Sequence, residues 1–217
     1  MRCAAFLLPA LVVASPVAQV VGNDGWADAP DPSEIQIVGA TFSGNGCPQK
    51  SVSTNISPDK TVITFGFDKF QTYIGPGISP FERSKNCQLH LQLKYPGGFQ
   101  FSVLESTYHG YAQLETGVTG NFYSTYYFSQ DAKATTTTQT SISGGGLWAD
   151  GQVYTKVDRV PTASYIFSPC GASGILNINN RIALTTTDRN AFGLITDDDA
   201  TVAFTQQLNI AWRSCRN

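Results

Sequence analysis

The sequence predicts an all-β protein: one antiparallel β-sandwich domain with jelly-roll-like connections and two disulfides. Apolar and polar residues alternate with a period of two through most of the chain, as in strands that are buried on one face. No segment shows the apolar stripe of a sustained helix, and Gly, Pro, Asn and Asp turn signals separate the alternating runs. A closed barrel stays open as the alternative, because alternation does not fix how a sheet closes.

The N-terminal residues have the layout of a secretory signal peptide. Arg2 precedes an apolar run of roughly a dozen residues, and small residues up to Ala18 provide a cleavage site. A membrane-spanning helix needs about 20 apolar residues, and no segment reaches that length. We therefore expect residues 1–18 to be a signal peptide, residues 19–33 a flexible linker and residues 34–217 the folded domain of a secreted protein without a membrane span.

Composition narrows the class of partner. Charged residues make up 14% of the chain, where about a quarter is usual, and the formal net charge is −2. Lys and Arg are scattered along the sequence, whereas a nucleic-acid-binding surface needs them concentrated on one face. We expect no nucleic-acid partner, and instead a monomer that meets an extracellular glycan or protein surface.

The strands follow in order along the chain. The clearest alternation covers 87–95, and it resumes at 99–103 after a Pro-Gly-Gly turn. The Thr-rich run 135–138 favours an edge or exposed strand, because β-branched Thr suits strands. Further strands are expected at 35–42, 61–67, 107–114, 121–129, 133–143, 152–157 and 164–167.

The C-terminal third is expected to form a long hairpin. Apolar residues recur on one face of 176–184 and again on one face of 202–212. The connection 188–199 carries Asn, Gly and Asp residues that suit a turn. Paired antiparallel strands bring their two open ends together.

The cysteines are expected to pair through this hairpin. Cys3 lies in the signal peptide, which leaves four cysteines for an oxidising compartment. Cys170 precedes the first hairpin strand and Cys215 follows the second, so we predict a bridge between them and a second bridge between Cys47 and Cys87. No two of these four lie within four residues of each other, so the usual spacing of zinc ligands is missing.

Short motifs around the cysteines and in the central strands carry a family resemblance. They are Cys47-Pro48, Ser84-Lys85-Asn86-Cys87, Gln100-Phe101-Ser102, Gly110-Tyr111-Ala112, Tyr126-Tyr127-Phe128-Ser129, Cys170-Gly171 and Trp212-Arg213-Ser214-Cys215. Through these motifs the chain resembles a family of small secreted, mostly fungal proteins that is defined by an uncharacterised domain. The family often has Arg where this chain has His109. The resemblance implies compartment and fold, and it implies no activity.

Aromatic residues provide the candidate binding site. The chain has 9 Tyr, 13 Phe and 3 Trp, and flat rings with polar tips suit the stacking of sugars at a wet surface. In the strand 121–129 we assign one face to the core and expect Tyr123 and Tyr127 to point outward, with core packing on both faces as the alternative. The core face holds Phe122, Tyr126 and Phe128.

A second aromatic group surrounds a histidine. Tyr108, His109 and Tyr111 are candidate pocket-lining residues, with a structural role for His109 as the alternative. His90 is expected as a lone imidazole on the polar face of its strand. The leading hypothesis is therefore a non-catalytic protein that binds a surface glycan, or a host or cell-wall protein as an effector-like or wall-associated factor.

The rival hypothesis is a polysaccharide hydrolase or lyase with carboxylates on a concave sheet face. Glycosidases need two carboxylates about 5 to 10 Å apart, and Glu105 with Glu115 is the best available pair if the two lie in neighbouring strands. The Gly-x-Ser-x-Gly motif of a serine hydrolase is absent from the sequence. We assign no catalytic residue.

Two further sites follow from local patterns. Asp197, Asp198 and Asp199 suit a hard cation such as Ca²⁺, and a solvated turn is the alternative. Asn55 begins an Asn-Ile-Ser glycosylation sequon, and Pro58 directly after it is expected to lower its occupancy.

Overall fold

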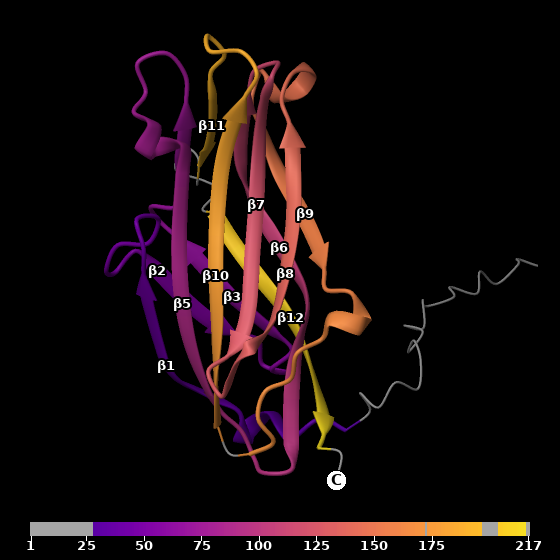
Figure 1. The fold of residues 1–217 in the computed structure, drawn as a ribbon. Coiled ribbons are helices and arrows are strands. Elements are labelled where there is room, and N and C mark those ends of the chain that lie inside the picture. The colour runs from indigo at the N-terminus through magenta and orange to yellow at the C-terminus, as the bar shows by residue number, and fades with distance from the viewer. Residues whose placement is uncertain (1–27, 172, 197–203, 216–217) are drawn as a thin grey trace, which may run out of the picture.

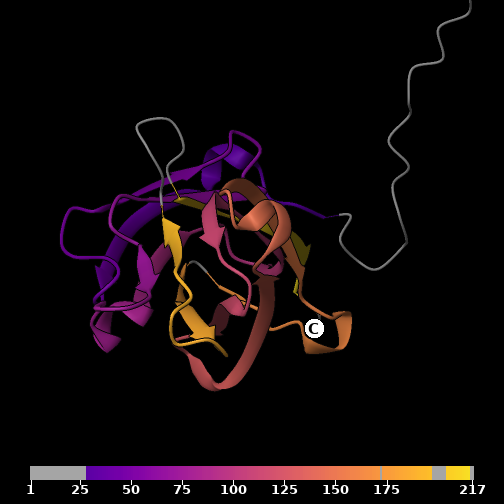
Figure 2. The ribbon, with the colours of Figure 1, turned by 90° about the horizontal axis from the view of Figure 1, so that it is seen from above.

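Two antiparallel sheets pack face to face in the computed structural model, which describes residues 28–171, 173–196 and 204–215 (Figure 1, and from above in Figure 2). The strands are β1 (Gln36–Ser43), β2 (Val52–Ile56), β3 (Val62–Phe67), β4 (Thr72–Ile74), β5 (Ser84–Lys94), β6 (Phe99–Leu114), β7 (Val118–Phe128), β8 (Asp131–Ser143), β9 (Gln152–Arg159), β10 (Ser173–Thr186), β11 (Gly193–Thr196) and β12 (Phe204–Ser214). Short 3₁₀ turns occupy η1 (Pro32–Glu34), η2 (Pro80–Arg83), η3 (Gly146–Trp148) and η4 (Thr162–Ser164).

Each sheet combines strands that are far apart in the sequence. Sheet A has the order β1-β5-β10-β7-β8, and sheet B has the order β2-β3-β12-β6-β11-β4 with β9 on the other edge of β6. The chain crosses repeatedly from one sheet to the other, in the manner of jelly-roll connections. The expected antiparallel β-sandwich is confirmed, and the two separate sheets replace the barrel alternative. Within the described residues no helix is long and apolar enough to cross a membrane.

Long alternating strands were predicted best. The expected edge strand at 135–138 is confirmed, because β8 is the last strand of sheet A. Two expected strands, 99–103 and 107–114, form the single strand β6, whose pairing with β12 shifts register in the middle. The expected strand at 164–167 is wrong, since η4 and a non-strand segment lie there. Strands β2, β4 and β11 were missed, because three to five residues are too few to show a period.

The expected C-terminal hairpin is wrong, although the disulfides predicted from it are confirmed. Strand β10 pairs with β5 and β7 in sheet A, whereas β12 pairs with β3 and β6 in sheet B. The supposed connection contains β11, which pairs with β4 and β6. Cys170 still bonds to Cys215, with 5.8 Å between their Cα atoms, and Cys47 bonds to Cys87. The first bridge therefore links the ends of two strands across the sandwich, not within a sheet.

Apolar side chains fill the space between the sheets around a small polar network. Gln206 of β12 donates from Nε2 to Ser106 Oγ of β6 at 2.9 Å, and it accepts from the Asn180 amide of β10. Ser124 of β7 bonds to the Asn180 amide oxygen and to the Tyr108 hydroxyl. All five side chains are at most 2% exposed, and their bonds join strands of both sheets. Buried polar groups with partners fix the relative position of the layers that they connect.

Candidate functional site

The outer face of sheet A gathers amides and tyrosines from its three central strands. The register sets residues of β5, β10 and β7 side by side, so each row across the sheet contains one side chain from each strand. Alternate residues of β5 and β7 are buried, so the residues between them point outward. Strand β10 follows the same register, although Asn177 on its outer side is only 2% exposed. The three central rows are His90, Asn177 and Tyr127; then Gln88, Asn179 and Thr125; then Asn86, Arg181 and Tyr123.

Cross-strand hydrogen bonds hold several of these side chains in place. The His90 ring nitrogen Nδ1 bonds to Asn177 Oδ1, and Asn177 Nδ2 donates to Ser129 Oγ at 2.8 Å. In the next row, Asn179 Nδ2 donates to Gln88 Oε1 at 2.9 Å. Asn177 is 2% exposed and its Nδ2 also donates to the Tyr127 and Ile175 carbonyls, so its bonding capacity is used within the sheet. Gln88 and Asn179 are half-buried, and their amides, each with two N–H donors and a two-lone-pair acceptor, keep capacity for a further partner. The face is therefore both ordered and able to form new hydrogen bonds.

The outward positions of β5, β10 and β7 hold no carboxylate within the described residues. The charged side chains at these positions are Lys94 at one end of β5 and Arg181 in β10, and the exposed Asp131 and Lys133 lie at the start of the edge strand β8. The Arg181 guanidinium carbon lies 5.0 Å from the centre of the Tyr123 ring, within the range of a cation–π contact. A partner rich in hydroxyl or acidic groups meets no negative charge at the outward positions of β5, β10 and β7.

A groove of about 440 Å³ lies beside the Asn86 row. Loop residues and η2 form one side of it, and the outer face of sheet A forms the other. Phe81 of η2 is 85% exposed, the most exposed large apolar side chain in the described structure. The residues that line the groove are Asn45, Pro80, Phe81, Ser84, Asn86, Asn179 and Arg181.

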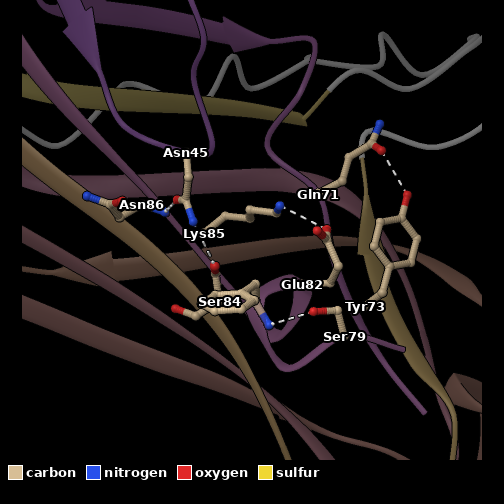
Figure 3. Close-up of polar contacts among 9 residues, drawn as sticks. Asn45, Gln71, Tyr73, Ser79, Glu82, Ser84, Lys85 and Asn86 are labelled. Atoms are coloured by element: carbon tan, nitrogen blue, oxygen red, sulfur yellow. Dashed lines mark hydrogen bonds and ion pairs between the residues drawn. The ribbon is translucent and has the colours of Figure 1, made fainter. Parts of the chain in front are cut away.

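Hydrogen bonds to the β5 backbone hold Asn45 in the groove wall (Figure 3). Asn45 Nδ2 donates to the Ser84 carbonyl at 3.3 Å, and the Asn86 amide donates to Asn45 Oδ1 at 2.8 Å. The neighbouring Gly44 has a φ of +140°, and a Cβ there would lie 2.3 Å from the Asn86 carbonyl oxygen, so only glycine lets the loop approach this closely. The Cys47–Cys87 disulfide fixes the same loop to the same strand.

The opposite end of the groove wall is the turn η2, which is held at both its ends (Figure 3). The Phe81 amide donates to Ser79 Oγ at 3.4 Å, as at an N-cap. Lys85 of β5 forms an ion pair with Glu82 at 2.9 Å. The Phe81 ring therefore projects toward solvent from a turn that is fastened to sheet A.

The structure distributes the five candidate binding residues over three places. Tyr123 and Tyr127 lie on the outer face of sheet A, as expected from the alternation. His109 and Tyr111 lie on the outer face of sheet B, with His109 Nδ1 at 3.0 Å from Thr155 Oγ1. Tyr108 lies in the core, where burial raises the pKa of its hydroxyl well above the usual value. The first pair belongs to the groove-bearing face, and the other three do not.

Sequence reasoning missed most of this face. Asn177, Asn179 and Arg181 follow the period of two set by Leu176, Ile178 and Ile182, so the sequence predicts that they lie on the other face of the strand, although the buried Asn180 interrupts the apolar series. Their neighbours across the sheet could not be predicted from the sequence, because β5, β7 and β10 are far apart in the chain. Asn45 and Phe81 lie outside the strands and follow no period.

The carboxylate pair of the rival hypothesis is not formed. Glu105 lies within β6 and Glu115 directly follows the same strand, so the two are about 33 Å apart along an extended chain and not in neighbouring strands. Glu105 instead accepts from Asn209 Nδ2 at 2.7 Å and pairs with Arg159 at 3.3 Å. Asp158 is buried, and desolvation raises its pKa despite a hydrogen bond from Thr140 and the Lys156 charge.

The signal peptide, the aspartate cluster, the linker and the glycosylation sequon are the remaining features predicted from the sequence. Residues 1–18 and Asp197, Asp198 and Asp199 lie outside the described residues, and within the described ranges no group of three or more His, Cys, Asp or Glu residues could hold a metal ion. The expected linker overlaps the described residues at its end, where Asp31 caps η1. Asn55 is exposed in β2, at the edge of sheet B.

The fold and its two disulfides define a β-sandwich protein of two antiparallel sheets. The chain belongs to the family of the domain of unknown function DUF4360, which matches residues 33–215. An uncharacterized secreted protein of Arthroderma benhamiae is 44% identical over 200 residues, which are 92% of this chain and 80% of that protein. The family resemblance and the secretion expected from the sequence are confirmed.

Solved structures show a distant likeness. A family 61 carbohydrate-binding module in complex with β-1,4-galactotriose aligns with a TM-score of 0.23 and 12% identity, over 83% of this chain and 91% of that chain. A family 11 carbohydrate-binding module from Clostridium thermocellum, in complex with a β-1,3-1,4-mixed-linked tetrasaccharide, aligns with a TM-score of 0.24 and 11% identity, over 85% and 94%. At such low TM-scores these modules do not locate a binding site on this chain.

Proposed function

We propose that this secreted protein is a non-catalytic module that binds an extracellular glycan on the outer face of sheet A. The observation that carries the proposal is the composition of this face: amides, hydroxyls and tyrosines from three adjacent strands, without a carboxylate at the described outward positions of these strands. Amides donate to and accept from sugar hydroxyls, and tyrosine rings stack on the apolar faces of sugars.

The geometry suits an extended ligand. Tyr123 and Tyr127 are four residues apart on β7, which places their Cα atoms about 13 Å apart on the same face. The half-buried amides of Asn179 on β10 and Gln88 on β5 lie in the row between them. Because a cross-strand hydrogen bond already orders these amides, binding loses less side-chain entropy than it would on a mobile surface.

A protein partner is the other expectation from the sequence. Protein interfaces have cores enriched in aromatic side chains and Met and depleted in charged ones, with a polar rim. On the three central strands the outward side chains of the middle rows are mostly amides and hydroxyls, with two tyrosines set apart along β7. This composition favours a glycan, whose hydroxyls are spread along its whole length.

Retention on insoluble chitin, glucan and cellulose tests the proposal. We expect the double variant Tyr123→Ala, Tyr127→Ala to weaken binding to the retained polysaccharide about tenfold or more, because each lost ring contact contributes on the order of 1 kcal/mol. The matched control is Tyr111→Ala, which removes a half-buried tyrosine from the outer face of sheet B. The control should bind like the parent protein.

Two outcomes contradict the proposal. Equal retention of the double variant and the parent would remove the tyrosines of sheet A from the site. Loss of binding in Tyr111→Ala alone would move the site to sheet B. Unfolding midpoints of all three proteins, measured alongside, show whether a loss comes from the surface or from the fold.

A further inference from the structure

The groove beside the outer face of sheet A contains a cation without a counter-ion. Arg181 is exposed, and among the described residues no side chain forms an ion pair or hydrogen bond with its guanidinium group. Its contact is the Tyr123 ring, 5.0 Å from the guanidinium carbon. A guanidinium stacked on a ring keeps its in-plane N–H groups free to donate.

The other groups of the groove add donors and no negative charge. Asn45, Asn86 and Asn179 contribute amides, Ser84 contributes a hydroxyl, and no carboxylate lines the groove. The nearest acidic residue in the wall, Glu82, is already neutralised by Lys85 at 2.9 Å. The groove therefore presents one unpaired positive charge that is surrounded by neutral hydrogen-bonding groups.

We propose that this groove binds the carboxylate of an acidic sugar, so that the glycan recognised by the protein contains uronic acid residues. The inference rests on the proposed function and names the substrate class of the same face. A carboxylate accepts two parallel hydrogen bonds from a guanidinium, and such charge-assisted bonds are stronger than bonds between neutral groups. The exposed Phe81 ring offers the apolar surface on which the same sugar ring can stack.

The size of the groove agrees with this ligand. Its volume of about 440 Å³ lies within the roughly 300 to 1,000 Å³ of small-molecule sites. It opens onto the Arg181 and Tyr123 row, so a sugar in the groove is continuous with a chain lying along β7 and β10. One acidic residue of a polysaccharide would occupy the groove while its neighbours contact the amides and Tyr127.

Calorimetric titration of the secreted protein with matched polysaccharides tests the inference. The probes are polygalacturonate and alginate, each compared with its carboxyl-reduced neutral form. We expect the acidic form to bind about tenfold or more tightly, because a hydrogen bond to a charged group is worth more than one to a neutral group. Raising the salt concentration should reduce this preference, since an exposed ion pair is screened.

Two variants assign the preference to the groove. Arg181→Gln keeps a donor but removes the charge, and it should bind acidic and neutral forms with equal affinity. Lys94→Gln removes the same charge from the far end of the same face and should keep the preference. Both residues are exposed, so neither change affects the core.

The outcomes separate this inference from the proposed function. Binding of neutral and acidic forms with equal affinity by the parent protein, lost in the Tyr123→Ala, Tyr127→Ala variant, would overturn the uronic acid preference and leave glycan binding standing. A preference that survives in Arg181→Gln would also overturn it. Absence of binding to any polysaccharide would overturn both.

Discussion

The two outer faces of the sandwich are built from the same alternation but carry different chemistry. On sheet A, amides bond to one another across strands and the Arg181 guanidinium has no counter-ion among the described residues. On sheet B, Glu105 pairs with Arg159, and two valines of β9 are each 50% exposed. The glycosylation sequon at Asn55 also lies on sheet B.

The difference between the two faces arises from the order of the strands in each sheet. Strand β3 of sheet B and strand β7 of sheet A both bury every second residue, so the period alone does not distinguish the two sheets. Strand order does: β10 lies between β5 and β7, and this brings three polar rows together. The face proposed to bind is therefore a product of non-local strand pairing.

The largest expected effect on stability comes from the disulfide that connects the two sheets. The Cys170–Cys215 bridge closes a loop across a sequence separation of 45 residues and links β10 of sheet A to β12 of sheet B. Replacing both cysteines with serine should lower the free energy of unfolding by about 4 kcal/mol, mainly because the unfolded chain gains freedom. Urea unfolding of the parent and the double variant measures this difference.

The same experiment tests whether the two faces form one folding unit. We expect a single transition in both proteins, since the buried Gln206 network still joins the sheets. Two separate transitions in the variant would mean that the sheets are stable independently. A change in the free energy of unfolding below about 1 kcal/mol would mean that the disulfide adds little to sheet packing that is already stable without it.

A smaller loss of stability is expected from a change in the buried polar network around Gln206. Gln206→Ala removes the acceptor of the Asn180 Nδ2 group and the donor to the Ser106 hydroxyl, and should cost about 2 to 3 kcal/mol through the buried polar groups left unsatisfied. The matched control is Gln207→Ala, one residue along the same strand but exposed on the outer face of sheet B. It should change the free energy of unfolding by about 0.5 kcal/mol or less. Equal effects of the two variants would contradict the role assigned to the network.

The sequence predicted the strands better than their arrangement. Alternation located the long strands and the outward direction of Tyr123 and Tyr127, because a strand's two faces are a local property. The disulfide Cys170–Cys215 was predicted correctly from a hairpin that does not exist. Strand ends that meet across a sandwich satisfy the same equal spacing as strand ends in a hairpin, so spacing does not distinguish the two.

The candidate site was predictable only in part for the same reason. Tyr108, His109 and Tyr111 are adjacent in sequence, yet alternation sends Tyr108 into the core and the other two to the outer face of sheet B. Asn179 and Arg181 come from a strand that showed no aromatic signal. They join the tyrosines of β7 through a register that no local pattern reveals.

The smallest expected effect concerns the sequon on sheet B. Asn55 is exposed on the outer face of that sheet, where it pairs with Thr64 of β3, so a glycan attached there projects away from sheet A. Asn55→Gln is the suitable variant, because the Ser57 hydroxyl accepts from the Val62 amide at 2.9 Å and its removal would disturb the turn. We expect the variant to lose any attached glycan, visible as a loss of mass.

Binding to the polysaccharides of the earlier tests should change less than about twofold in Asn55→Gln, because the modified side chain and the proposed site lie on opposite faces. The reason is geometric: the packed core separates the two sheets, so a group on one outer face does not reach the other. A clear gain of affinity without the glycan would mean that it shields the binding surface. The site would then extend to sheet B, and the two faces would not be independent.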